Sequence, residues 1–283
     1  VVIERYAVLL SVVAYLAIST VSLCLIVGVA TVGPGRLYRL RHDALPRIRE
    51  VKPQILLLVA VLLVSAVARE RLQIVSRLYG IYLTGAIFAF EGEFVAWLQA
   101  TFATPLRTLY FSWVYVYGYV FLLVFPFVAY GVLEESTTLK RLMTAYALNY
   151  AVGLVCYTVV YAHGPRNIMP DMVQPLLFTF NPDVLALTSE INENTNVFPS
   201  LHTSLSVTVA LFALLTRREY PGWAAVATPL ALSVVVATMY LGIHWLVDVI
   251  AGIALAVGCV FASYRFVSPA AGETTEDTAS VVE

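Results

Sequence analysis

The sequence predicts an all-α protein, a polytopic transmembrane helix bundle of about six to seven spans with interfacial helices on the outer face. Of its 283 residues, 60% are hydrophobic and only 12% are charged, and the mean hydropathy is +0.83. A soluble domain carries about 25% charged residues. So few charges could not cover the surface of a soluble monomer. The composition therefore favours an integral membrane protein over a soluble enzyme, a disordered chain or a disulfide scaffold.

Net charge and cysteine content give no sign of a nucleic-acid partner or of a disulfide framework. The net charge is −1, so the chain lacks the basic surface that nucleic-acid binding requires. Cys24, Cys156 and Cys259 lie far apart inside apolar runs, which is typical of packing residues.

Residues 1–108 are predicted to contain two spans and an outer interfacial segment. The first apolar run, Tyr6–Val32, is too long for a signal-peptide core and has no small-residue cleavage site, so we expect it to remain as a span. The following loop, Gly33–Lys52, carries six cations, which marks the cytoplasmic side. The second span is predicted over Pro53–Ala68, which is short for the bilayer.

The segment Arg69–Thr108 is apolar but carries Glu91 and Glu93 in its middle. Two carboxylates disfavour a span, so we expect helical pieces at the outer interface. This interpretation places the arginines of its first turns outside, against the usual charge distribution.

Residues 109–267 are predicted to form a helical core with five further spans. Cations at Lys140–Arg141, Arg217–Arg218 and Arg265 fall on the side of the first basic loop, so the N-terminus is predicted outside and the C-terminus inside. The five spans are predicted over Leu109–Gly131, Leu142–Ala162, Pro199–Thr216, Gly222–Ile243 and Trp245–Phe266.

Two polar segments complete the organisation. The connection His163–Phe198 is predicted to lie outside, and long structured connections are usually functional. The tail, residues 268–283, contains four acids and no hydrophobic periodicity, so we expect it to be disordered.

The start of one core span has the features of an anion site. Pro199 suits the first turn of a helix, where free N–H groups and the helix dipole attract negative charge. Ser200 adds a hydroxyl donor, and His202 follows it. The ordinary alternative is a capped helix start whose histidine contacts water.

A second candidate pair is formed by His244 and Asp248. On a helix, four residues make about one turn, so the carboxylate can reach the imidazole. Such a contact fixes the tautomer and leaves the other ring nitrogen free as a nucleophile or base. An acid within a transmembrane segment is by default a functional hypothesis. A structural hydrogen bond is the alternative.

The helix lengths predict that these residues meet. From His202 the chain descends for about 15 residues, roughly 22 Å, and the next span returns it to His244 at the same outer end. Arg166 closes the preceding span at that end, and its guanidinium fork suits a phosphate group. The sequence thus predicts one site from Arg166, Ser200, His202, His244 and Asp248.

These motifs resemble those of the PAP2 (type 2 phosphatidic acid phosphatase) superfamily. The run Pro199–His202 is similar to its P-S-x-H motif, and His244-x-x-x-Asp248 to the end of its third motif, over about residues 109–266. The form Pro-Ser-Leu-His-Thr-Ser with Gly-x-His-Trp-x-x-Asp resembles the inositol phosphorylceramide synthase branch. Two motif cations are absent, because Val159 and Ala237–Thr238 stand in their places, and Arg77 or Arg107 is a candidate substitute.

The resemblance implies a lipid-phosphate phosphatase or phosphotransferase. By this likeness, His244 attacks phosphorus, Asp248 orients it, and His202 protonates the leaving alkoxide. Arg166 and Ser200 would hold the phosphate oxygens. No metal or cofactor is implied. The expected partners are a lipid phosphate, membrane lipids and, for a transferase, an alcohol acceptor. The expected location is the plasma membrane, as a multi-pass protein with its site outside.

Other classes of function remain as alternatives. A seven-span transporter or binding protein would need no catalysis, although the chain has neither a repeat symmetry nor a lysine in its last span for a retinal group. A metal-dependent enzyme could use His202, His244 and Asp248 as ligands. Water or an alcohol could accept the phosphoryl group, so hydrolase and transferase both stay open.

Overall fold

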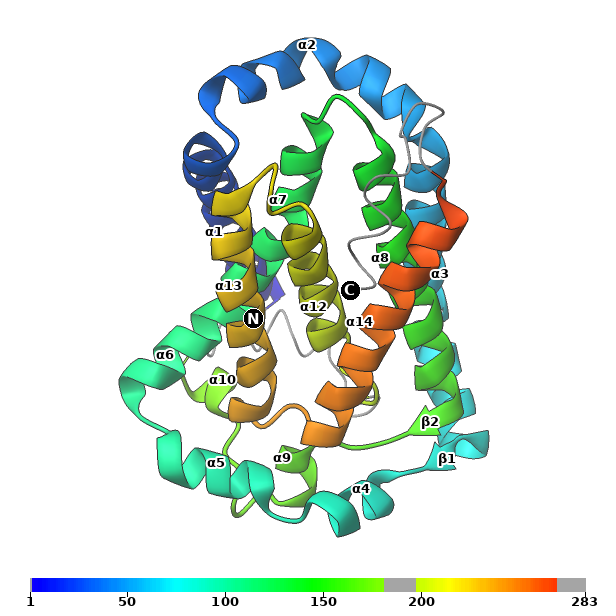
Figure 1. Ribbon diagram of the computed structural model, residues 1–283. Coiled ribbons are helices and arrows are strands. Elements are labelled where there is room, and N and C mark those ends of the chain that lie inside the picture. The colour runs from blue at the N-terminus through cyan, green and yellow to red at the C-terminus, as the bar shows by residue number, and fades with distance from the viewer. Residues whose placement is uncertain (1, 181–196, 269–283) are drawn as a thin grey trace.

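The computed structural model describes residues 2–180 and 197–268 and is built almost entirely of helices (Figure 1). Within this part of the chain, six helices are long and apolar enough to cross a membrane. The predicted all-α polytopic bundle is therefore confirmed, and the chain is a multi-pass membrane protein. Residues 269–283 of the predicted tail and residues 181–196 of the predicted outer connection lie outside the described residues.

Two long helices at the side of the bundle are joined across one end by a third. The helices α1 (Val2–Thr31) and α3 (Lys52–Tyr79) are connected by α2 (Pro34–Glu50), which crosses what we call the α2 end (Figure 1, top). The predicted basic loop is thus a helix. Pro34 suits its first turn, and Arg47 and Arg49 in its last turn complement the helix dipole.

Helix α3 continues well past Ala68, where the second span was predicted to end. Its 28 residues extend for about 42 Å, which exceeds the roughly 30 Å hydrocarbon core. The arginines that interrupt the apolar pattern therefore prolong the same helix instead of beginning an interfacial segment.

Short elements close the opposite end of the bundle, which we call the site end (Figure 1, bottom). Here α4 (Thr84–Glu91) and α5 (Phe94–Phe102) lie across the ends of the long helices. They are short helical pieces of the kind predicted for this segment. A parallel strand pair, β1 (Ile81–Tyr82) with β2 (Val160–Tyr161), joins the ends of α3 and α8.

The core of the bundle consists of the later helices. The first of them runs unbroken through a π-helical turn, η1 (Val114–Gly118), between α6 (Pro105–Trp113) and α7 (Tyr119–Gly131). Its successors are α8 (Thr137–Val159), α12 (Leu201–Leu215), α13 (Pro221–Tyr240) and α14 (Leu246–Phe266).

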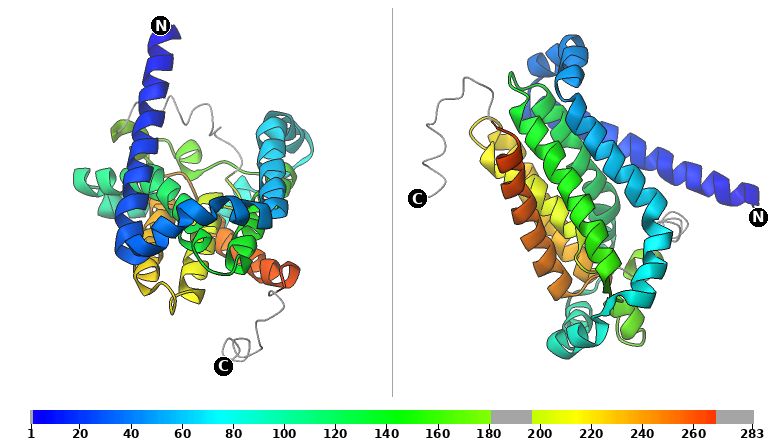
Figure 2. Two further views of the ribbon diagram at one scale, coloured as in Figure 1. Left: turned by 90° about the horizontal axis from the view of Figure 1, so that it is seen from above. Right: turned by 90° about the vertical axis from the view of Figure 1, so that its right-hand side faces the viewer.

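The shortest core helix, α12, is packed inside the bundle against α8, α13 and α14. Toward the α2 end its Phe212 joins Phe125 and Trp223 in a fully buried aromatic cluster. In contrast, only 11% and 6% of the apolar stretches of α1 and α3 are buried, and Figure 2 shows α1 leaning away from the other long helices. The exposed apolar faces of α1 and α3 suit contact with lipid.

Candidate active site

Two helix beginnings meet at the site end, those of α12 and α14. The backbone N–H of Ser200, the residue before α12, donates to the carbonyl of Asp248 in α14 at 3.0 Å. A Cβ atom at Gly252 would lie 2.6 Å from the carbonyl oxygen of Ser200, so only glycine permits this approach. The two helix starts, distant in the chain, are therefore locked together.

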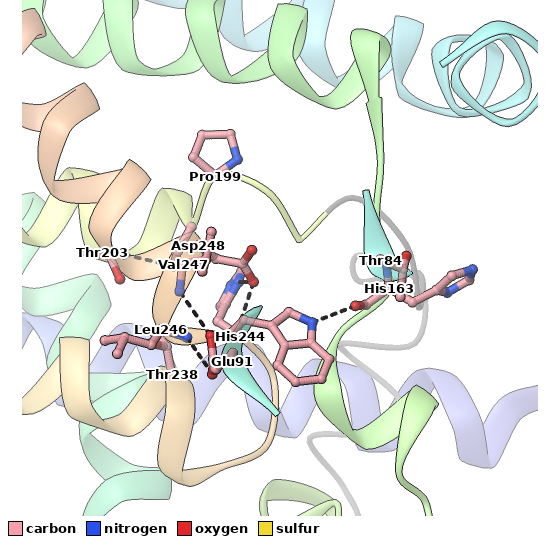
Figure 3. A network of polar contacts seen from close by, with 12 residues as sticks. Thr84, Glu91, His163, Pro199, Thr203, Thr238, His244, Leu246, Val247 and Asp248 are labelled. Atoms are coloured by element: carbon pink, nitrogen blue, oxygen red, sulfur yellow. Dashed lines mark hydrogen bonds and ion pairs between the residues drawn. The ribbon is translucent and has the colours of Figure 1, made fainter. Parts of the chain in front are cut away.

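His244 lies in the turn between α13 and α14, not on a helix as the four-residue spacing suggested. Its N–H donates to the carbonyl of Thr238 at 3.0 Å, and Gly242 turns the chain with a φ of 72°. Asp248 is the third residue of α14. Its Oδ2 accepts a hydrogen bond from the Trp245 N–H at 2.9 Å and lies 3.4 Å from His244 Nδ1 (Figure 3).

The predicted pair therefore forms through helix capping, because an acid in the first turn turns back toward the residues before the helix. With Nδ1 facing the carboxylate, Nε2 of His244 is the ring nitrogen left for chemistry. Both residues are buried: His244 exposes 5% of its surface and Asp248 exposes 0%. Asp248 Oδ1 has no hydrogen-bond partner among the described residues.

His202, the second residue of α12, is held between two tyrosine rings. Its ring centroid lies 4.5 Å from that of Tyr115 and 4.3 Å from that of Tyr119. Both tyrosines come from the π-helical region, and such turns often occur at functional sites. The backbone contact between Ser200 and Asp248 joins the start of α12, which carries His202, to the His244–Asp248 pair, so both histidines lie at one site.

The sequence places Tyr115 and Tyr119 in an aromatic run, which is typical of a membrane-interface belt. The structure instead buries Tyr115 against His202. The four-residue spacing of Tyr115 and Tyr119, which places both on one helix face, is the signal that could have indicated a shared inward contact.

Ser200 is the N-cap of α12, and Pro199 precedes the helix instead of beginning it. The Oγ of Ser200 accepts a hydrogen bond from the backbone N–H of Thr203 at 3.3 Å, which leaves the hydroxyl proton available to a ligand. The Ser200 N–H is already used by Asp248 and the Thr203 N–H by Ser200 itself. The helix start thus offers fewer free N–H groups than the sequence suggested.

Arg166 reaches the site from the short helix α9 (Pro165–Ile168). Its backbone N–H donates to the carbonyl of Gly242 at 3.3 Å, which ties α9 to the His244 turn. The guanidinium carbon lies 5.0 Å from the centroid of the Phe178 ring in α10 (Leu176–Phe180), and its buried Nη1 has no hydrogen-bond partner among the described residues. Burial lowers the pKa of Arg166 and the nearby Tyr115 opposes this, yet an arginine stays charged at neutral pH.

Glu91, at the end of α4, was missed as a site residue. Its Oε1 and Oε2 accept hydrogen bonds from the N–H groups of Leu246 and Val247 at 2.9 and 3.1 Å, at the start of α14 (Figure 3). The sequence did carry a signal, because an acid within an apolar stretch needs a partner when it is buried.

The candidate substitutes for the missing motif cations do not contact these residues. Arg107 donates to the carbonyl of Phe102 at 3.1 Å and lies over that ring, and the side chain of Arg77 is exposed. At the motif position itself, Thr238 donates to the carbonyl of Val235 in its own helix. In the described part of the chain, no three His, Cys, Asp or Glu side chains gather as a metal site would require.

This arrangement defines an integral membrane protein in which a buried histidine, a half-buried histidine and a half-buried arginine suit an anionic group. A family model of the PAP2 superfamily matches residues 88–262, which is more than half of the chain, and the chain belongs to this superfamily. The matched range includes the end of α4 and all of α5. No curated protein and no solved structure matches this chain. Membership supports a phosphatase-type activity, either a phosphatase or a phosphotransferase.

Proposed function

We propose that the protein is a lipid-phosphate phosphatase or phosphotransferase that works through a phosphohistidine. The observation that carries the proposal is that the start of α12 with His202 is joined to the His244–Asp248 pair at the start of α14. Arg166, whose Nη1 has no partner among the described residues, is tied to the same turn. A phosphate group has the charge and the acceptor oxygens that such a site lacks.

The chemistry proceeds in two displacements. Nε2 of His244 attacks phosphorus, and the bond from phosphorus to the lipid oxygen breaks while His202 donates a proton to that oxygen. Water or an alcohol then attacks the phosphohistidine and gives its proton to His202, which restores both imidazoles. Arg166 and the Ser200 hydroxyl stabilise the non-bridging oxygens where charge develops.

A lipid substrate is supported by the position of the protein in the membrane. The exposed apolar faces of α1 and α3 keep the protein in the bilayer, where the tail of a lipid phosphate also lies. The α2 end carries paired cations on its connections, and the positive-inside rule favours the cytoplasm for that end. We therefore propose that the site end faces outside, at the plasma membrane.

The acceptor is the finer part of the proposal. The motif likeness to inositol phosphorylceramide synthases favours an alcohol acceptor, with an inositol-phosphate lipid as donor. In the hydrolase version, water is the acceptor at the same site. Phosphatidate or a polyprenyl phosphate could then be the donor, because the same two displacements apply to it.

The test uses the full chain in phosphatidylcholine liposomes that contain phosphatidate, polyprenyl phosphate or phosphatidylinositol, each with and without an alcohol acceptor. We expect phosphate release or transfer from at least one donor and a trapped phosphate on His244. His244→Ala should abolish both, and full activity after EDTA treatment would oppose a metal-dependent mechanism.

His163→Ala is the matched control, because His163 lies at the same end and contacts Thr84 and Trp245 through its backbone atoms. Equal activity of wild type and His244→Ala, or no turnover of any donor by the wild type, would contradict the proposal.

A further inference from the structure

The start of α14 is capped by a carboxylate from another part of the chain. Helix starts leave N–H groups without partners inside the helix. Glu91 satisfies two of them at once, with Leu246 N–H at 2.9 Å and Val247 N–H at 3.1 Å. A negative charge at this position also interacts favourably with the helix dipole.

The same short helices hold the other side of the His244 turn. Gln99 of α5 is buried, and its Nε2 donates to the carbonyl of Tyr240 at 2.8 Å, where α13 ends. Its Oε1 accepts from Gln174 N–H at 2.8 Å, and its Nε2 also donates to the Gln174 carbonyl at 3.0 Å. The turn that carries His244 is thus fixed by Gln99 before it and by Glu91 after it.

Asp248 gives this cap a chemical consequence. Asp248 lies in the first turn of α14, where its carboxylate is itself a natural acceptor for free N–H groups. Because Glu91 occupies the N–H groups of Leu246 and Val247, Asp248 Oδ2 is left to the Trp245 N–H and to His244 Nδ1. Without Glu91, Asp248 would have a competing use away from the imidazole.

We propose that Glu91 is a positioning residue for His244, because it occupies the α14 start and so keeps Asp248 directed at the imidazole. The inference rests on the proposed function, in which His244 is the nucleophile. Glu91 touches neither substrate nor the reacting nitrogen; it acts through Asp248.

The carboxylates of Glu91 and Asp248 both accept N–H groups at the start of α14, so each acts on the other. Burial raises the pKa of the Glu91 carboxyl, the two donated N–H groups oppose the rise, and the charge of Asp248 adds to it. Two carboxylates are thus held near one another at one helix start, and this costs free energy. The hydrogen bonds that Glu91 accepts at the start of α14 offset this cost.

The test compares Glu91→Gln with Glu93→Gln in the full chain. Glu93 lies two residues away with an exposed side chain, so the same chemical change there should be silent. In Glu91→Gln we expect kcat for the lipid phosphate turned over by the wild type to fall by about 10–100-fold, with KM within about twofold, because a misplaced nucleophile slows chemistry more than binding. Glu91→Asp keeps the charge and should recover part of kcat.

A second measurement needs no turnover. Side-chain ¹⁵N NMR of histidine-labelled protein, assigned with His244→Ala, reports the tautomer of His244. We expect the Nδ1-protonated form in wild type and Glu93→Gln, and a mixture of tautomers in Glu91→Gln.

Unchanged kcat in Glu91→Gln, or an unchanged His244 tautomer, would overturn the inference. So would a loss of activity that follows only the loss of folded protein. Absence of turnover in the wild type would contradict the proposed function alone, because the tautomer measurement still decides the role of Glu91.

Discussion

The two ends of the bundle treat their charges in opposite ways. At the α2 end, charged groups pair with one another near solvent: Arg36 with Glu219 at 2.7 Å, and Glu50 with both Arg47 and Lys140 at 3.2 Å. A hydrogen bond from Ser136 lowers the pKa of Glu50, burial opposes this, and the two cations add to the lowering.

At the site end, two charged side chains have buried atoms that no hydrogen bond uses. Arg166 Nη1 and Asp248 Oδ1 have no hydrogen-bond partner among the described residues. An unpartnered buried polar atom costs about 1–3 kcal/mol, and more when it is charged. Such a cost is expected where a ligand supplies the missing partner. The contrast teaches that the α2 end uses charge for structure, whereas the site end holds charge in reserve for an anion.

The largest effect that would test this contrast is expected from Asp248→Asn. The amide keeps the shape of the side chain but favours the wrong tautomer of His244, as in the aspartate-to-asparagine change of a serine protease triad. We expect kcat to fall by about 10³–10⁴-fold with little change in the melting temperature. Steady-state kinetics and a thermal melt in the same liposomes measure both, and a loss below about tenfold would contradict the role of Asp248.

Arg166→Lys should have the next largest effect. Lysine keeps the positive charge but has no planar fork, so it cannot donate two parallel hydrogen bonds to a phosphate. We expect kcat/KM to fall by about 10²-fold, with a further loss in Arg166→Ala. Binding of orthovanadate, measured by inhibition, should weaken in the same order. Equal activity of the lysine variant and the wild type would show that charge alone suffices.

The pH dependence should report Glu91. Since the pKa of Glu91 is raised by burial and by Asp248, it takes up a proton at a higher pH than an exposed glutamate, and this weakens its hold on α14. The groups facing it are Asp248 and the His244 turn. We expect log kcat of the wild type to fall more steeply on the acid side than the one-proton fall of Glu91→Gln. Parallel acid limbs in the two proteins would contradict this prediction.

The smallest effect is expected at the α2 end. Arg36→Gln breaks the ion pair with Glu219, but both side chains are substantially exposed, at 40% and 46%. Such a surface pair contributes about 0–1 kcal/mol, so we expect unchanged kcat/KM and a melting temperature within a few degrees. A loss of activity here would show that charge at the α2 end also serves the site.

Much of the fold could be predicted from local patterns. Apolar runs of bilayer length located the long helices because each run satisfies its own backbone hydrogen bonds. The ends of helices were predicted less well. Helix α3 passes Ala68 without a break because arginine is a good helix former, although it interrupts an apolar run. The basic loop became α2 because its residues are also compatible with a helix.

The candidate site was predicted where its members lie close in the sequence. His244 and Asp248 meet, and Ser200 and His202 stand at one helix start. The physical reason given for the first pair was wrong, because the chain forms a capped turn there instead of a continuous helix.

The sequence by itself determined the class of protein and the residues whose chemistry suits a phosphate. Composition, run lengths and short motifs are local properties, and they survive whatever the neighbouring segments do. Only the tertiary structure decided that Glu91 caps α14 and that Tyr115 and Tyr119 enclose His202. These contacts join segments far apart in the chain, and their geometry follows from how the helices pack, which no local pattern encodes.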